Sequence, residues 1–288
     1  MNRKIIFCLP GNESLTAKLA KELSIETGII HIKQFPDKET YIRIESEVKG
    51  AEAVLVCTLN EPDNKLLPLY FLCKTLYELG AEKITLVSPY LAYMRQNKRF
   101  FPGEAVTTRL FAGMISDMVD ELITVDPHLN DSLDLSSFYN IPVKVLHAAP
   151  LIVQWIKENI KKPLLVAHND ESRKWIGEIA SSVSAPYITL SQKTEDEDVN
   201  MASELKKWEG YKPVIVDDII VTARTMIIAV RKLKSAGGEL PVCIGVHGIF
   251  AGMAELQLFS TDAEIITTNA VPHHTNRIDI TPLLTPLL

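Results

Sequence analysis

The stretch KPVIVDDIIVTARTM, residues 212–226, contains the pattern that decides the fold. A run of apolar, mostly β-branched residues of strand type ends at two adjacent carboxylates, Asp217 and Asp218. A short loop follows, and a helix then begins at residues 222–225 and continues to residue 238. A buried strand followed directly by a helix is the repeating unit of parallel α/β proteins. The stretch therefore predicts that the chain belongs to the α/β class.

The same alternation extends along the whole chain. Further strands are expected at residues 4–9, 53–59, 83–90, 121–128, 162–170, 185–190 and 241–248. Helices are expected at 14–24, where Leu15, Leu19 and Leu23 share one face, and at 64–80, where Gly80 stops the helix. We predict two doubly wound, mostly parallel-sheet α/β domains, residues 1–145 and 146–288, with the seam in NIPVKVLHAAP (140–150).

Length and composition exclude several classes of protein. The 288 residues suit two domains, and 30 Lys and Arg against 36 Asp and Glu give a net charge of -6. This balance argues against a nucleic-acid partner. No apolar stretch is long enough to cross a membrane, and the N-terminus lacks a signal-peptide cleavage site. Four separated cysteines are interpreted as small buried hydrophobes, so we expect a reduced, cytoplasmic protein with no membrane partner.

Residues 217–225 also have the composition of a sugar-phosphate site. The hydroxyls of Thr222 and Thr225 and the free N–H groups of a helix N-terminus suit a phosphate. The carboxylates of Asp217 and Asp218 can accept hydrogen bonds from the vicinal hydroxyls of a sugar. The same pattern is also compatible with an ordinary helix cap preceded by exposed acids.

VDDIIVTARTM resembles the ribose 5-phosphate loop of the phosphoribosyltransferase-type fold, and in particular that of the ribose-phosphate pyrophosphokinase family. Three other motifs are similar to the same family: QFPDKETYIRI (34–44), SPYLAYMRQNKRFFPGEAVTTRL (88–110) and TVDPHL (124–129). The resemblance covers nearly the whole chain. It implies transfer of the diphosphoryl group of MgATP to the 1-hydroxyl of ribose 5-phosphate, with release of AMP. It also implies a homo-oligomer, either a dimer or multiples of dimers.

The resemblance assigns ATP to the N-terminal half. Phe35, Asp37 and Glu39 match the adenine-binding segment, where an aromatic face can stack on a purine and carboxylates can accept from its amine. Without the resemblance this segment is compatible with an edge strand carrying solvent-facing charges. Residues 95–99, within the motif at 88–110, form a basic loop. This loop supplies a dense set of donors for a polyphosphate, namely Arg95, Gln96, Lys98 and Arg99. Such a loop can also be a solvated surface feature.

The resemblance implies Mg²⁺ as the cofactor. Asp126 and His128 match the family's metal and triphosphate site, and Asn169 and Asp170 are further candidate ligands. Mg²⁺ usually takes one or two protein ligands and completes its shell with water and phosphate oxygens, so a sparse set is adequate. A single histidine at a strand end is, on its own, more often a surface residue.

Residues 191–211 form a polar, acidic excursion that we expect to be mobile. Lys193 is the candidate catalytic cation there, alongside His128 and Arg95, and a solvated surface lysine is the alternative. The acidic run at 195–198 would repel a polyphosphate.

The sugar-phosphate loop itself departs from the family pattern. Ala223 and Arg224 lie within it, with Arg224 in place of a usual Gly and Val221 in place of a usual Asp. Asn97 and Asn169 also replace frequent Asp residues, unless Asp170 takes the second position by a one-residue shift. These departures leave two other possibilities open. One is a catalytically weak regulatory paralogue that binds nucleotide or sugar phosphate, and the less favoured one is a phosphoribosyltransferase.

Overall fold

The computed structural model describes residues 3–129, 134–168, 172–190 and 203–288 and separates the chain into two compact units. Unit 1 contains the residues up to His147 together with Ala270–Pro272 and Thr281–Leu288, and unit 2 contains Ala148–Asn269 and His273–Ile280. The division after His147 lies two residues beyond the expected seam at 145. The C-terminal residues differ from the expectation, because they group with the N-terminal unit.

Contacts along the N-terminal strand and helix explain this grouping. Lys4 Nζ donates a hydrogen bond to the Leu288 carbonyl. Thr285 Oγ1 donates to Glu22 Oε2 at 2.8 Å. The end of the chain therefore completes the packing of unit 1.

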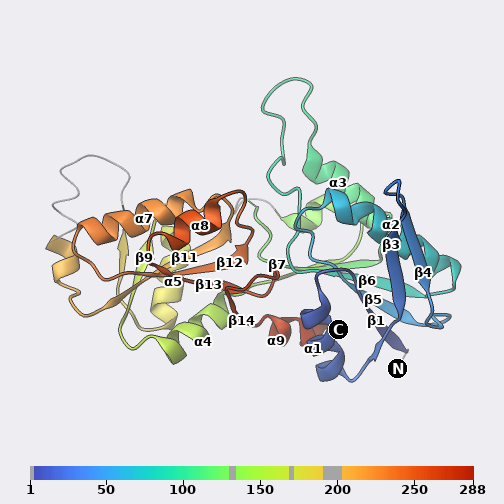
Figure 1. Ribbon diagram of the computed structural model, residues 1–288, viewed down its shortest axis with the longest axis horizontal. Coiled ribbons are helices and arrows are strands. Elements are labelled where there is room, and N and C mark those ends of the chain that lie inside the picture. The colour runs from blue at the N-terminus through green and yellow to red at the C-terminus, as the bar shows by residue number, and fades with distance from the viewer. Residues whose placement is uncertain (1–2, 130–133, 169–171, 191–202) are drawn as a thin grey trace. The chain divides into compact units, whose positions relative to one another are not determined.

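Unit 1 is a parallel sheet with helices on both faces, and a separate hairpin lies beside it (Figure 1). Its strands are β1 (Lys4–Cys8), β2 (Glu26–Thr27), β3 (Ile30–Gln34), β4 (Thr40–Ile44), β5 (Glu52–Val56), β6 (Lys83–Ser88), β7 (Glu121–Val125) and β8 (Val143–Leu146). Its helices are α1 (Glu13–Leu23), α2 (Asp63–Glu78), α3 (Thr107–Ser116), α9 (Thr281–Leu284) and two short 3₁₀ turns, Leu135–Phe138 and Thr285–Leu287. The parallel sheet has the order β2-β1-β5-β6-β7-β8, and β3 and β4 form the antiparallel pair.

Unit 2 repeats the same architecture. Its strands are β9 (Pro163–Ala167), β10 (Tyr187–Thr189), β11 (Lys212–Ile220), β12 (Val242–Gly248), β13 (Glu264–Thr268) and β14 (Asn276–Ile278). Its helices are α4 (Ala149–Asn159), α5 (Arg173–Ser182), α7 (Arg224–Ser235) and α8 (Ala254–Phe259). All strand pairs are parallel in the order β10-β9-β11-β12-β13-β14, and Figure 1 shows helices on both faces. The predicted doubly wound, mostly parallel α/β fold is confirmed for both units.

The local sequence signals act as expected. Leu15 and Leu19 of α1 are buried, whereas Leu23 is only half-buried. Gly80 adopts φ 89° directly after α2, a left-handed conformation that glycine reaches without a Cβ clash. The central strands are buried on both faces because helices cover both sides of each sheet.

Two further expectations concern single residues and membranes. Cys57, Cys73 and Cys243 are buried as predicted, but Cys8 is only half-buried. Burial raises the pKa of the Cys57 thiol to about 12, so this thiol stays protonated at neutral pH.

Across the described part of the chain, no helix combines the length and the apolar character that a membrane crossing requires.

Candidate functional site

The hairpin loop of unit 1 carries the residues that match the adenine-binding segment. Phe35 follows β3, and its backbone N–H donates to the Glu39 carbonyl at 2.8 Å, which closes the turn before β4. Asp37 Oδ1 accepts from the Glu39 N–H at 3.1 Å. The Phe35 ring meets Tyr41 edge-on at 5.9 Å between centroids and is 51% exposed. One aromatic face is thus held in place and remains accessible to a flat ligand.

The basic loop between β6 and α3 is organised by one carboxylate. Glu104 Oε2 accepts hydrogen bonds from Gln96 Nε2 at 3.1 Å and from the N–H groups of Phe100 and Phe101 at 2.8 and 3.0 Å. The backbone N–H of Phe101, followed in size of effect by that of Phe100, lowers the pKa of Glu104. Arg99 Nε donates to the Glu104 carbonyl at 3.0 Å. Glu104 was not among the predicted site residues, although it lies inside the quoted motif.

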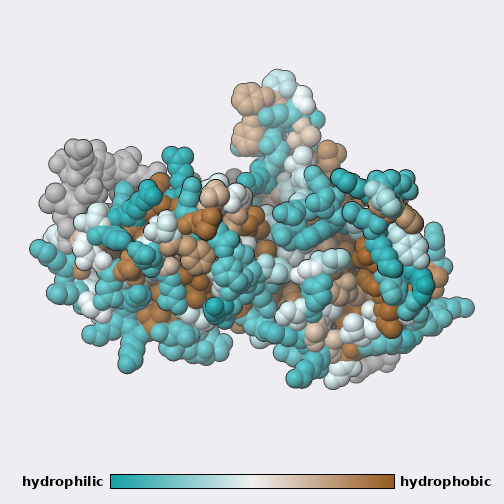
Figure 2. Space-filling view, viewed as in Figure 1, coloured by the Kyte–Doolittle hydropathy of each residue, from teal (hydrophilic) through white to brown (hydrophobic). Residues whose placement is uncertain are grey.

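This loop presents both charge and apolar surface. Lys98 Nζ lies 5.3 Å from the centre of the Phe100 ring, within cation–π range, and Arg95 is exposed. Phe100 and Phe101 are 59% and 70% exposed. Figure 2 shows apolar surface at the tip of the loop, which projects from unit 1 near α3 in Figure 1. The loop therefore offers cations and donors that a polyphosphate can approach from solvent.

Three neighbouring parallel strands bring the other polar groups of unit 1 to one sheet edge. β6, β7 and β8 are adjacent, so the segments that follow them lie at a common carboxyl edge. The Val125 N–H donates to the Pro89 carbonyl at 3.2 Å, and the Asp126 N–H donates to the Leu146 carbonyl at 2.9 Å. The start of the basic loop and the predicted metal residues thus share this edge. The Phe35 loop belongs to the separate hairpin.

Asp126 is fixed by a histidine that was not predicted. Its Oδ1 lies 2.8 Å from His147 Nδ1, and its backbone φ of 36° is in the left-handed region that Asp tolerates. His147 directly follows β8, so the rule of inspecting polar residues after each apolar run would have found it. The predicted His128 lies two residues after Asp126 and is exposed.

These donors suit the Mg²⁺ that the resemblance implies. The Asp126 side chain is 17% exposed, so its carboxylate lies at the surface of a sheet edge where an ion could keep its waters. One carboxylate and a nearby imidazole are too few for a structural zinc site but adequate for magnesium that also binds phosphate oxygens. The other predicted ligands, Asn169 and Asp170, and the predicted catalytic Lys193 lie outside the described residues.

In unit 2, β11 does not end at the two carboxylates, which corrects the sequence prediction. The strand continues to Ile220, and its ladder with β12 pairs Asp217 with Gly245 and Ile220 with Gly248. Ile219 and Ile220, which follow the two carboxylates, extend the strand because β12 supplies backbone hydrogen-bond partners for them. Both carboxylates are half-buried, and Asp217 Oδ1 accepts from the Asp218 N–H at 3.1 Å.

The start of α7 has the features of an anion site. Ala223 is the N-cap residue with φ 54°, and its methyl side chain cannot accept a hydrogen bond from the first helical turn. The N–H groups of the first helical turn are therefore available to a ligand. Thr222, Arg224 and Thr225 are exposed around this turn. Arg224 is the first helical residue, it is exposed, and its φ is not in the left-handed region, so a residue other than Gly causes no backbone strain at this position.

A second loop braces this anion site. The N–H groups of Ile249 and Phe250 donate to the Ile220 carbonyl at 2.9 and 3.0 Å, and the Ala251 N–H donates to the Val221 carbonyl at 2.8 Å. Gly245 and Gly248 lie on the neighbouring strand, and a Cβ at Gly245 would come within 2.6 Å of Ile220 Cδ1. The loop conformation at 220–223 thus depends on glycine in β12.

Comparisons with known proteins agree with these observations. Residues 4–118 match the family described as the N-terminal domain of ribose phosphate pyrophosphokinase, and residues 134–273 match the phosphoribosyl transferase domain. The ribose-phosphate pyrophosphokinase of Methanobrevibacter smithii is 33% identical over 289 residues, which cover 93% of this chain and 94% of the relative. That of Saccharolobus solfataricus is 32% identical over 260 residues, 88% of each chain.

A solved structure has the same fold. Phosphoribosylpyrophosphate synthetase from Mycobacterium smegmatis superimposes with a TM-score of 0.84 and covers 99% of this chain and 97% of its own. The two sequences are 23% identical. The likeness therefore concerns the arrangement of strands and helices.

Proposed function

The chain belongs to the ribose-phosphate pyrophosphokinase family, and from this we propose that it is a ribose-phosphate diphosphokinase. It transfers the diphosphoryl group of MgATP to the 1-hydroxyl of ribose 5-phosphate and forms phosphoribosyl diphosphate and AMP. The 1-hydroxyl oxygen attacks the β-phosphorus in line, and the bond from this phosphorus to the oxygen that leaves with AMP breaks.

The nucleotide is assigned to unit 1. Phe35 would stack on the adenine, and Asp37 and Glu39 would accept from its exocyclic amine. The polyphosphate would be bound by the basic loop through the side chains of Arg95, Gln96, Lys98 and Arg99. The order that Glu104 imposes on this loop supports the assignment, because donors held in place before binding cost less to organise.

Magnesium is assigned to Asp126 and His128, with Asn169 and Asp170 as additional ligands. When bound, it would neutralise charge on the phosphate oxygens. The chain's own catalytic groups are then Arg95, His128 and Lys193, whose cations or donors would stabilise the negative charge that develops during transfer. His147 would act as a positioning residue, because it holds the Asp126 carboxylate at 2.8 Å.

Ribose 5-phosphate is assigned to unit 2. Asp217 and Asp218 would accept from the ribose hydroxyls. The phosphate would bind at the start of α7, where the N–H groups and the side chains of Thr222, Ala223, Arg224 and Thr225 surround the helix N-terminus. The backbone of Ala223 is the single observation that best supports the proposal: among the N-cap residues of the described helices it alone has a positive φ, 54°, and its methyl side chain leaves the first-turn N–H donors for a ligand.

The test is an assay of AMP release driven by ribose 5-phosphate, with pure protein and MgATP. Asp218→Ala should abolish turnover, and Thr225→Ala should raise the KM for ribose 5-phosphate about tenfold, the effect of losing about 1.4 kcal/mol of binding. Ser235→Ala, at the other end of α7, is the matched control and should behave as wild type. Unchanged turnover in Asp218→Ala would overturn the assignment.

One observation favours a second candidate, a catalytically weak regulatory paralogue. Val221 occupies a position where the family commonly has an Asp, and its carbonyl is already engaged by the Ala251 N–H. The same assay separates the candidates. Saturable binding of nucleotide or sugar phosphate without any product would support the regulatory role, and consumption of phosphoribosyl diphosphate with a base would indicate a phosphoribosyltransferase.

We also propose a homo-oligomer, a dimer or multiples of dimers, that works in the cytoplasm on these two small substrates. Light scattering after size exclusion should give at least twice the mass of one chain. A particle of 32.2 kDa, the mass of one chain, would refute the oligomer.

A further inference from the structure

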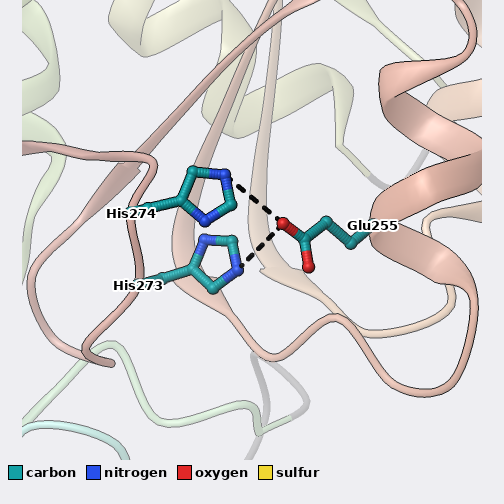
Figure 3. Close-up of side chains that lie close together, drawn as sticks. All are labelled: Glu255, His273 and His274. Carbon is teal, nitrogen blue, oxygen red and sulfur yellow. Dashed lines mark ion pairs between the residues drawn. The ribbon is translucent and has the colours of Figure 1, made fainter.

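Unit 2 contains a cluster of two imidazoles and one carboxylate that the proposed reaction does not use. Glu255 lies in the first turn of α8, and His273 and His274 lie in the loop between β13 and β14. Figure 3 shows both rings turned toward Oε1 of Glu255 from the same side. One donor atom of each residue lies within 4.8 Å of the others.

The distances match a shared ion better than direct hydrogen bonds. Glu255 Oε1 lies 3.6 Å from His273 Nε2 and 3.3 Å from His274 Nε2. A charge-assisted N–H···O hydrogen bond is usually about 2.7–2.9 Å long. A tetrahedral zinc ion with ligands at about 2.0–2.1 Å separates its donor atoms by about 3.3 Å. Both observed separations are close to that edge length.

The half-buried imidazole of His273 is held by a hydrogen-bond network of the kind that orients metal ligands. His273 Nδ1 lies 2.8 Å from Thr275 Oγ1, which is in turn 2.8 Å from Thr267 Oγ1. Asn276 Nδ2 donates to Thr267 Oγ1 at 2.8 Å, and Asn276 Oδ1 accepts from the backbone N–H of His273 at 2.8 Å. In the tautomer that carries its proton on Nδ1, His273 donates to Thr275 Oγ1 and leaves Nε2 for the ion, as ligating histidines typically do.

Aromatic rings support the two imidazoles. The Phe250 ring packs on His273 at 4.5 Å, and the Phe259 ring stacks on His274 at 5.6 Å. The cluster is open on one side, because the side chains of His273, Glu255 and His274 are 18%, 35% and 64% exposed. An ion can enter there and keep a water ligand.

We propose that Glu255, His273 and His274 form a binding site for one divalent transition-metal ion of the zinc type. Two nitrogens and one carboxylate oxygen are a common zinc ligand set, with water in the fourth position. Mg²⁺ prefers oxygen ligands, so this site is separate in place and chemistry from the magnesium assigned to unit 1. The ion would join α8 to the loop that follows β13.

Zinc binding to the chelator-treated full chain tests the proposal, measured by calorimetry in excess Mg²⁺ so that oxygen-rich sites are occupied. Wild type should bind one more equivalent of Zn²⁺ than the double variant Glu255→Gln/His274→Gln. Each single variant should lose at least about tenfold in affinity, the lower bound for losing even an orienting residue. Co²⁺ in place of Zn²⁺ should give a tetrahedral visible spectrum in wild type that the double variant lacks.

Two controls separate ligation from a structural role. His31→Gln removes a different histidine–glutamate pair, His31 Nε2 with Glu45 Oε1 at 3.1 Å, and should bind Zn²⁺ as wild type does. Thr275→Val should weaken Zn²⁺ binding about 10- to 100-fold, and Thr275→Ser should restore it. Equal stoichiometry and affinity in wild type and the double variant would overturn the proposal. The proposed reaction is tested by AMP release in variants of other residues, so the zinc-site proposal and the proposed reaction can fail independently of each other.

Discussion

Replacing Glu121 with glutamine should destabilise unit 1 without changing the kinetic constants. Glu121 begins β7, at the opposite end of the strand from Asp126. Its side chain is 9% exposed, with Oε2 at 2.6 Å from Lys83 Nζ and Oε1 at 2.5 Å from Lys144 Nζ. Burial acts to raise the pKa of Glu121, but the two lysines outweigh it and the pKa is lowered. The carboxylate is therefore more stable in the folded chain than in water.

The magnitude follows from this geometry. Hydrogen bonds to charged groups contribute roughly 1.5–3 kcal/mol each when they are well buried. Both lysine side chains are 40% exposed, so solvent screens part of each interaction. Glutamine keeps one acceptor but loses the charge. We expect the free energy of unfolding to fall by about 2 kcal/mol, which lowers the Tm by about 4–8 °C.

The lowered pKa fixes the sign of the pH dependence. The contribution of Glu121 is fully present above the unfolded-state carboxyl pKa of about 4.3, and it is lost as the pH falls through the lower folded-state pKa. Calorimetric Tm values of wild type and Glu121→Gln should therefore differ by a constant amount from neutral pH down to about pH 5. The difference should shrink below about pH 4.

The same substitution at Glu52 is the matched control. Glu52 begins β5 in the same sheet, but its Oε2 lies 3.6 Å from Lys4 Nζ and its side chain is 25% exposed. Glu52→Gln should cost less than about 1 kcal/mol. Both variants should keep wild-type kcat and KM. Equal stability of Glu121→Gln and wild type at neutral pH, or a Tm difference that persists unchanged in acid, would refute the reasoning.

Three other predictions concern the proposed substrate sites. Glu104→Gln should raise the KM for MgATP, because Glu104 Oε2 organises the basic loop, and equal KM values for Glu104→Gln and wild type would contradict this. Since N–H donors lower the pKa of Glu104, the KM of wild type for MgATP should rise only at pH values below the usual carboxyl pKa of about 4.3. Asp126→Asn should increase the Mg²⁺ concentration that gives half-maximal AMP release, and an unaltered Mg²⁺ titration would exclude Asp126 as a ligand. Gly245→Ala places a Cβ 2.6 Å from Ile220 Cδ1, so denaturant unfolding should show a loss of about 1–3 kcal/mol and kinetics a higher KM for ribose 5-phosphate; wild-type values would rule out this coupling.

The residue pattern around 212–226 illustrates how far local sequence information reaches. It correctly indicated a buried strand followed by a helix. The same periodicity located β1, β5, β6, β7, β9, β10 and β12 to within a few residues, but it did not locate β2, β3, β4, β8, β13 or β14. It misplaced the end of β11, because the strand continues through Ile219 and Ile220 only where β12 offers hydrogen-bond partners. Strand ends depend on such neighbours, which the local pattern does not specify.

The residues of the candidate site also fall into those that the sequence indicated and those that it did not. The order of polar residues after apolar runs pointed to Arg95, Asp126 and the start of α7, because parallel strands place their carboxyl ends at one edge. The pairing of Asp126 with His147 and the order that Glu104 gives to its loop were not predicted. Each depends on how a loop folds back or on which strands become neighbours.

The sequence by itself determined the α/β class, the two-part organisation and the family, because hydrophobic periodicity and short motifs are local properties of the chain. Only the tertiary structure decided that the C-terminal residues complete unit 1 and that Glu121 lies between Lys83 and Lys144. It alone brought Glu255 to His273 and His274. These arrangements join residues from separate elements, and their contacts form only when the packing of strands and helices sets the distances between side chains.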